Sequence, residues 1–158
     1  MNARQQGFTL IELIVVIVVL GILAATIVPR FTNIQKDARA GAVQGMEAAV
    51  RSAAAMYHGV KLAIGSAAGT AVPADRFEGL AAGNDVSDTQ FYPAASATGI
   101  GRIVLDEAGD FTTVANAGPP ATYEWRYTSA TTPTNCYVRY QEAAANTPPQ
   151  ITTDTSGC

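Results

Sequence analysis

The chain has 158 residues, which suffices for one compact domain and one extended element but not for two ordinary domains. Residues 1–61 carry six basic and three acidic side chains (+3), whereas residues 62–158 carry four basic and ten acidic side chains (−6), giving the net charge of −3. Because a nucleic-acid surface needs clustered Lys and Arg, this acidic distal part argues against a nucleic-acid partner.

A short polar leader, residues 1–7, precedes the most apolar segment of the chain. Residues 8–28 (FTLIELIVVIVVLGILAATIV) carry a single charge, on Glu12. As a helix this run is about 30 Å long, the thickness of the hydrocarbon core of a bilayer. It is longer than the apolar region of an ordinary secretory signal, and no small-residue cleavage site follows it. We therefore predict a cleavage point before the run, at Gly7, and one membrane-spanning helix that the mature chain keeps.

Glu12 is the informative residue of this segment. An ionised carboxylate inside hydrocarbon is costly unless it finds a partner, so such residues are usually functional. Removal of the leader would place a new α-amine on Phe8, one helical turn from Glu12, and the same amine of a neighbouring chain is an equally suitable cation. The alternative is that Glu12 lies at the headgroup level and reaches water.

The residues around Glu12 resemble the type III signal of type IV pilins and pseudopilins. They read GFTLIE at positions 7–12 and continue into the long aliphatic run. The resemblance implies cleavage between Gly7 and Phe8 by a membrane-embedded prepilin peptidase, followed by N-methylation of Phe8. It also implies that Glu12 aids assembly by pairing with the N-terminal amine of a neighbouring subunit. The KDAR stretch at 36–39 and the C-terminal CYVRY and GC elements are similar to mannose-sensitive haemagglutinin (MSHA)-type pilins.

The end of the apolar run contains two residues that weaken a helix. Pro29 lacks an N–H and should kink or loosen the preceding turn, and Gly21 lowers helix propensity upstream of it. Pilins that resemble this chain lose helix between such a Gly and Pro within the fibre. A simple kink in an intact helix is the alternative.

Helical periodicity continues beyond Pro29. Charged side chains lie mostly off an apolar stripe, Glu47 and Arg51 form an i,i+4 pair, and Gly65 is the expected C-terminal cap. From Phe8 to Ile64 such a helix would extend about 85 Å, more than a chain of this size can bury by itself. Its lower half needs lipid or other copies of the chain, which predicts a homopolymer. The stripe consists of Ile34, Ala38, Ala42, Met46, Ala49, Ala53, Tyr57 and Val60.

The distal residues predict loops and then an antiparallel sheet. Residues 66–99 are full of turn formers. Residues 102–105 and 111–114 flank the sequence DEAGD as a predicted hairpin pair. Residues 123–128 and 136–141 alternate apolar or aromatic with polar side chains, as half-buried antiparallel strands do, and residues 150–153 add an edge. The predicted fold is α+β, with a long N-terminal helix packed on a C-terminal antiparallel sheet. Its parts are a cleaved leader (1–7), a transmembrane and assembly helix (8–29), its amphipathic continuation (30–65) and a globular loop and sheet domain (66–158).

The two cysteines, Cys136 and Cys158, both lie near the C-terminal end. Behind an export signal, two such thiols indicate one disulfide in an oxidising compartment, and a pair of free buried thiols is the alternative. Closing a loop of this length would contribute about 3 kcal/mol by chain-entropy arguments.

No residue pattern indicates an enzyme. The acidic residues Asp106, Glu107 and Asp110 lack the full EF-hand pattern, so we interpret them as a solvated turn rather than a calcium site. His58 is the one histidine, and no catalytic triad, HExxH motif or phosphate loop accompanies it. We therefore predict no catalytic residues, no metal and no cofactor.

Two observations disagree about the side of the membrane on which the distal domain lies. Arg4 precedes the predicted span, while Arg30, Lys36 and Arg39 follow it, and the positive-inside rule would place the distal domain in the cytoplasm. The cysteine pattern and the family resemblance place it outside, and we follow these. We expect a single-pass precursor in the bacterial inner membrane and then an extracellular pilus on the cell surface.

The sequence therefore predicts a structural subunit of a type IV, MSHA-like pilus, used for adhesion, attachment or motility. Its partners would be identical copies, the prepilin peptidase and the pilus assembly machinery. The alternatives are a pseudopilin of a type II secretion system, a minor pilin with a binding role at the tip, and a membrane protein with an uncleaved anchor that never polymerises.

Overall fold

The computed structural model describes residues 8–158, apart from the side chains of residues 28–33. The described residues fall into two compact units, and the boundary lies between Ala38 and Arg39. The first unit is the N-terminal part of a helix, and the second contains the rest of that helix, the loops and the sheet.

Helix α1 (Leu10–Ala63) contributes to both units. Thr9 precedes it, and the Thr9 hydroxyl oxygen accepts a 3.3 Å hydrogen bond from the N–H of Glu12. Thr9 therefore acts as the N-cap of α1, and Glu12 follows it at the spacing of the capping-box sequence pattern. At the other end Gly65 has a φ of 62°, the left-handed conformation common just after a helix. The C-terminal cap predicted at Gly65 is therefore confirmed.

The segment of α1 that contains Gly21 and Pro29 is helical throughout. A Cβ added at Gly21 would meet nothing within 4 Å. Packing within the single chain therefore gives no reason for glycine at this position. Loss of helix between Gly21 and Pro29 in a fibre stays a prediction.

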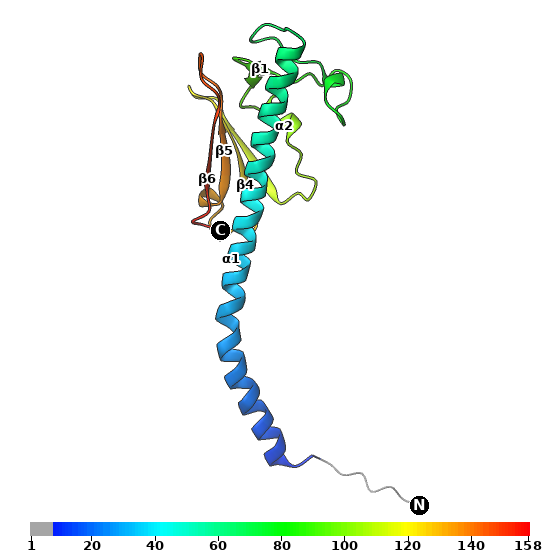
Figure 1. The fold of residues 1–158 in the computed structure, drawn as a ribbon. Helices are drawn as coiled ribbons and strands as arrows, with labels where there is room; N and C mark the ends of the chain where they lie inside the picture. The colour runs from blue at the N-terminus through cyan, green and yellow to red at the C-terminus, as the bar shows by residue number, and fades with distance from the viewer. Residues whose placement is uncertain (1–7) are drawn as a thin grey trace, which may run out of the picture. The chain divides into compact units, whose positions relative to one another are not determined.

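The distal unit contains one four-stranded antiparallel sheet, in the order β3-β4-β5-β6 (Figure 1). Aromatic and aliphatic side chains alternate with polar ones along the central strands, and Trp125, Val138 and Tyr140 are almost completely buried. The predicted α+β fold is confirmed, including the strands expected near residues 123–128, 136–141 and 150–153. The strand bounds are β3 (Phe111–Asn116), β4 (Thr122–Tyr127), β5 (Tyr137–Gln141) and β6 (Gln150–Asp154).

The distal part of α1 packs on this sheet through a stripe that matches the predicted one in part, since Met46, Ala53 and Tyr57 are buried as expected. Val43 and Val50, which the predicted stripe did not include, are fully buried, whereas Ala42 is half-buried and Ala49 is exposed. The period was right, but this helix is rich in alanine, which fits a buried or an exposed face equally well. Burial of a valine side chain contributes more free energy than burial of an alanine side chain, so the valines decide which side of the helix faces the sheet.

The segment predicted as the first strand is instead a helical turn, α2 (Ile100–Ile103). Ile100 and Val104 are both buried, and their spacing of four residues is that of a helix face rather than a strand face. The predicted pairing of residues 102–105 with residues 111–114 was therefore wrong. Strand β3 pairs with β4 instead.

Residues 64–99 form loops with three short elements: η1 (Ala74–Arg76), β1 (Asp88–Thr89) and β2 (Tyr92–Pro93). A small second core holds them near the end of α1. In it the rings of Tyr57 and Phe77 stack in parallel with centroids 5.7 Å apart, and the Tyr57 hydroxyl donates to the carbonyl of Val86 at 3.1 Å. Burial and the nearby Asp88 carboxylate raise the pKa of Tyr57, which therefore stays a neutral donor.

Candidate assembly site and its supports

The N-terminal part of α1 presents an unbroken apolar surface. Leu10–Ile27 has a mean hydropathy of 3.0, and none of it is buried. Among the described residues this is the one helix long and apolar enough to cross a membrane. So much exposed apolar area is unfavourable in water, so this surface requires lipid or other apolar helices.

Glu12 lies in the first turn of α1, within this apolar surface. Its Oε2 atom is 3.5 Å from the Thr9 hydroxyl, and among the described side chains it takes part in no ion pair. A carboxylate in the first helical turn is favoured by the helix dipole, yet it keeps acceptor capacity for a cation. Phe8 is 89% exposed and lies one turn before it, and Gly7 lies outside the described residues. The processing site and the role of Glu12 therefore stay predictions.

A buried ion pair fixes the other end of α1, and the sequence analysis missed it. The Nζ atom of Lys61 lies 3.1 Å from Oδ2 of Asp88, and both side chains are fully buried. Lys61 also donates to the carbonyl of Thr70, and the N–H of Gly69 donates to Asp88 at 3.1 Å. Lys61 thus ties the last turn of α1 to two loop segments. No local pattern in the sequence signals this pairing.

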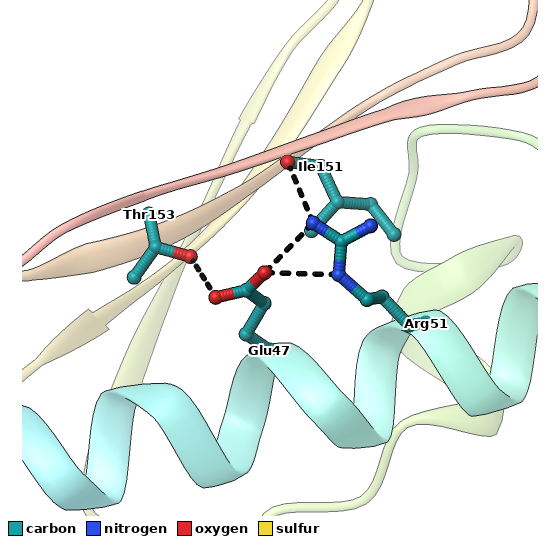
Figure 2. Close-up of polar contacts among 4 residues, drawn as sticks. All are labelled: Glu47, Arg51, Ile151 and Thr153. Carbon is teal, nitrogen blue, oxygen red and sulfur yellow. Dashed lines mark hydrogen bonds and ion pairs between the residues drawn. The ribbon is translucent and has the colours of Figure 1, made fainter.

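Side-chain hydrogen bonds of Glu47 and Arg51 attach strand β6 to the distal part of α1 (Figure 2). The predicted i,i+4 pair is confirmed, with Arg51 nitrogens 2.7 and 2.9 Å from Oε1 of Glu47. The structure adds two contacts from β6: the Thr153 hydroxyl donates to Glu47 at 2.7 Å, and Arg51 donates to the Ile151 carbonyl at 3.3 Å. The hydrogen bond from Thr153, and then those from Arg51, lower the pKa of Glu47 from its ordinary value of 4.5.

We expect Glu47→Gln to lower the free energy of unfolding by about 0.5–1.5 kcal/mol at neutral pH. A carboxyl whose pKa is lowered by folding stabilises the fold above its unfolded pKa, and that contribution is lost as the pH falls through the folded pKa. The difference in thermal midpoint between the wild type and Glu47→Gln should therefore be largest near pH 7 and shrink below about pH 4.5.

Thermal unfolding followed by circular dichroism between pH 3 and pH 7 measures this effect. Glu107→Gln, in the exposed turn before β3, removes the same charge and should leave the midpoint unchanged. A Glu47→Gln deficit that stays constant down to pH 3 would contradict the role given to the carboxylate.

The disulfide joins Cys136 and Cys158, with an S–S distance of 2.04 Å and both residues buried. Backbone hydrogen bonds support the same connection, since the N–H of Gly157 donates to Asn135 at 2.8 Å and the N–H of Thr132 donates to Gly157 at 2.9 Å. The final segment is therefore held against the residues that lead into β5.

A second ion-pair cluster, on the outer face of the sheet, was also missed. Glu124 and Arg139 are cross-strand partners, and Glu124 accepts hydrogen bonds from Arg139 at 2.6 Å and from Arg126 at 2.9 Å. Burial alone would raise the pKa of Glu124, but the two guanidinium groups outweigh it and hold that pKa below its usual range. The available signal was one or two charged residues within each of two otherwise aromatic and apolar strands, because opposite charges at facing positions stabilise a sheet.

The remaining candidate residues, Asp106 and His58, make hydrogen bonds to backbone groups of the fold. Asp106 accepts hydrogen bonds from the N–H groups of Gly109 and Phe111, at 3.1 and 2.8 Å, which is the geometry of a turn. Within residues 8–158 no group of three or more His, Cys, Asp or Glu side chains could hold a metal ion. Nδ1 of His58 lies 3.1 Å from the carbonyl oxygen of Phe91.

These observations define a class of protein: a subunit with an exposed apolar anchor helix and an antiparallel sheet packed on its distal part. Residues 2–28 match the family described as the prokaryotic N-terminal methylation motif. The chain is 36% identical to fimbrial protein Q of Moraxella bovis over 108 residues, which cover 65% of this chain and 68% of that protein. It belongs to the type IV pilin and pseudopilin family. It is accordingly a structural subunit and not an enzyme.

Two further relatives match over shorter segments. The major component of the type IV narrow pilus of Thermus thermophilus is 53% identical over 53 residues, 34% of this chain and 46% of that protein. Type II secretion system core protein G of Pseudomonas aeruginosa is 47% identical over 58 residues, 36% of this chain and 41% of that protein. The chain thus spans less than half the length of these two relatives. No solved structure is significantly similar to it.

Proposed function

We propose that this chain is the structural subunit of a type IV pilus of the MSHA-like kind, a surface fibre for adhesion, attachment or motility. The match to fimbrial protein Q carries the proposal. It extends over 108 residues, whereas α1 ends at Ala63, so the similarity must reach into the distal domain. The disulfide-closed segment at the end of the distal domain supports the same assignment.

In this proposal the prepilin peptidase cleaves between Gly7 and Phe8, and Phe8 is then N-methylated. The exposed apolar surface of Leu10–Ile27 holds the precursor in the inner membrane. The pilus assembly machinery transfers it into a helical homopolymer, where other copies of α1 cover the same surface. Because Glu12 would then lie among apolar helices, it pairs with the Phe8 amine of a neighbour.

The helix between Gly21 and Pro29 is the segment that unwinds on assembly in this proposal. Pro29 already removes one backbone hydrogen bond, and Gly21 lowers helix propensity at a position where an added Cβ would meet nothing within 4 Å. Unwinding would let adjacent subunits adjust their axial spacing.

A pseudopilin of a type II secretion system is the second candidate. The 47% identity to core protein G supports it, but that match covers only 58 residues, fewer than the 63 up to the end of α1. A minor pilin with a binding role at the fibre tip is the third candidate.

Electron microscopy and mass spectrometry of fibres sheared from cells test the proposal. We expect surface fibres whose dominant subunit begins at N-methylated Phe8. Recovery of the chain in trace amounts would indicate a minor pilin, and fibres confined to the periplasm would indicate secretion. Retention of residues 1–7 in cells with an active peptidase would overturn the assignment altogether.

A further inference from the structure

Strand β3 (Phe111–Asn116) is one of the two edge strands of the four-stranded sheet, and it is exposed on both of its faces. Phe111 is half-buried, and the other five residues are exposed, including Val114 at 37%. Charged residues, prolines and bulges normally keep an exposed edge from pairing with another strand. Strand β3 contains no charge and no proline, and its six residues pair one to one with β4, without a bulge. Such an edge indicates a strand-pairing surface.

The opposite edge of the same sheet, strand β6, is covered by α1. Arg51 donates to the backbone carbonyl of Ile151, and the Thr153 hydroxyl donates to Glu47. In β3, by contrast, the one group with comparable protection is the N–H of Phe111, which donates to the carboxylate of the preceding turn at 2.8 Å. The sheet therefore has one covered edge and one open edge, and the open edge of one copy cannot pair with β6 of another.

The register of the sheet fixes which backbone groups of β3 point away from it. The N–H of Thr128 donates to the carbonyl of Asp110 at 2.8 Å, at the start of the ladder between β3 and β4. Bonding direction alternates along antiparallel strands, so Thr112 also bonds to β4, while Thr113 and Ala115 direct their N–H and C=O groups outward. We name these four outward groups the β3 edge.

The β3 edge is complementary to a second copy of itself. In an antiparallel pair centred on Val114, Thr113 of each copy faces Ala115 of the other, and all four groups of each copy are satisfied. The two Val114 side chains then meet at a position without backbone hydrogen bonds, where the Cα atoms are about 4.5 Å apart. Since β3 carries no charge, the paired strands bring no like charges together. A pair centred on Thr113 would instead need the N–H of Phe111, which Asp106 already holds.

We propose that the β3 edge joins two copies of this chain by antiparallel strand pairing centred on Val114. The two copies of such a pair are related by a two-fold axis normal to the sheet. Because the distal part of α1 packs on the face of the sheet, the same rotation reverses the direction of α1. Subunits of one fibre point the same way, so the partner copy belongs to a second fibre that runs in the opposite direction. The identity of this fibre partner rests on the proposed function, whereas the pairing of two chains does not.

A single contact of this kind is small. It engages one strand of six residues from each copy, whereas stable interfaces typically bury about 1,600 Å². Isolated chains should therefore pair weakly. Two fibres present many copies along their length, and after the first contact the others form at a high effective concentration. The β3 edge is therefore suited to reversible lateral association of fibres.

A single introduced cysteine tests the pairing and its register on unassembled chains. The two natural cysteines form a disulfide with each other, so Val114→Cys supplies the one free thiol. In the proposed pair the two new thiols lie on Cα atoms about 4.5 Å apart, within the range of a disulfide. Asn116→Cys is the matched control, because it is exposed on the same face of β3 but lies roughly 13 Å along the strands from its copy.

The experiment uses the full mature chain in detergent, oxidised gently over a range of concentrations and analysed by peptide mapping without reduction. We expect at least tenfold more disulfide-linked dimer from Val114→Cys than from Asn116→Cys, with the Cys136–Cys158 bond intact. Ala115→Pro removes an outward N–H at an edge position that tolerates proline, and it should lower the dimer yield of Val114→Cys at least tenfold. Equal dimer yields from the two cysteine variants, no effect of the proline, or no dimer at any concentration would overturn the proposal.

Electron microscopy of purified fibres tests the fibre partner. We expect wild-type fibres to associate side by side, and fibres of Val114→Lys to stay separate at unchanged yield, because like charges would face each other across the pair. Leu105→Lys adds the same charge at an exposed residue outside β3 and should associate as the wild type does. Separate wild-type fibres, or lateral association that persists in Val114→Lys, would overturn the fibre partner. A chain that forms no fibres at all would contradict the proposed function alone, since the cysteine experiment needs none.

Discussion

Glu12→Ala is expected to leave cleavage after Gly7 intact and to reduce the yield of fibres at least tenfold. Glu12 lies in an apolar surface that neighbouring helices would cover, and there a charge pair is weakly screened. Losing about 1.4 kcal/mol per docking event already lowers the association constant tenfold. Mass spectrometry of the membrane fraction measures cleavage, and quantification of sheared fibres measures assembly.

Two control variants distinguish the effect of losing the Glu12 charge from the effect of losing the helix N-cap. Glu12→Gln keeps the size of the side chain and should assemble nearly as poorly as the alanine variant, because its neutral amide can accept a hydrogen bond but cannot form an ion pair with the ammonium group. Thr9→Ala removes the N-cap, which is worth about 0.5–2 kcal/mol of helix stability, but keeps the carboxylate and should assemble well. Wild-type fibre yield from Glu12→Ala, or an equal loss in Thr9→Ala, would remove the docking role.

The N-terminal segment could be predicted because the residues that define it are neighbours in the sequence. Apolar length, the position of Glu12 and the preceding Gly7 and Phe8 all lie within one short stretch. The capping role of Thr9 was equally local and could have been recognised from the Thr-x-x-Glu spacing. Strands β4 and β5 were predictable for a similar reason, since apolar or aromatic side chains alternate with polar ones over most of each strand.

What could not be predicted depends on segments that are distant in the sequence. Lys61 could equally have been a solvent-exposed lysine at the end of a helix, and its burial depends on the loop that delivers Asp88. The pocket of about 230 Å³ that His58 lines is formed by residues distant in the sequence, including Tyr92 of β2 and Pro148, and no local pattern signals that they meet. The helical turn at Ile100 was misjudged because a short apolar run suits strand and helix alike.

The buried pair of Lys61 and Asp88 leads to the largest stability effect that we expect. Removing one partner of a buried ion pair leaves an uncompensated charge, which typically costs about 3–5 kcal/mol. In Lys61→Met the Asp88 carboxylate would keep the Gly69 N–H, while its Oδ1 atom already has no hydrogen-bond partner among the described residues. Since whole domains are stable by about 5–15 kcal/mol, this variant should be close to unfolding at physiological temperature.

Trp125, the one tryptophan and 1% exposed, reports on unfolding of the distal domain. Urea denaturation of the detergent-solubilised mature chain, followed by Trp125 fluorescence, should show the loss in Lys61→Met. The double variant Lys61→Met/Asp88→Asn should recover more than half of it, because the amide oxygen can still accept from Gly69 while no charge stays buried. Arg51→Met removes an exposed charge from the same helix and should cost under about 1 kcal/mol. If Lys61→Met costs no more than Arg51→Met, or the double variant is no more stable than the single one, then the pair does not hold the end of α1 to the loops.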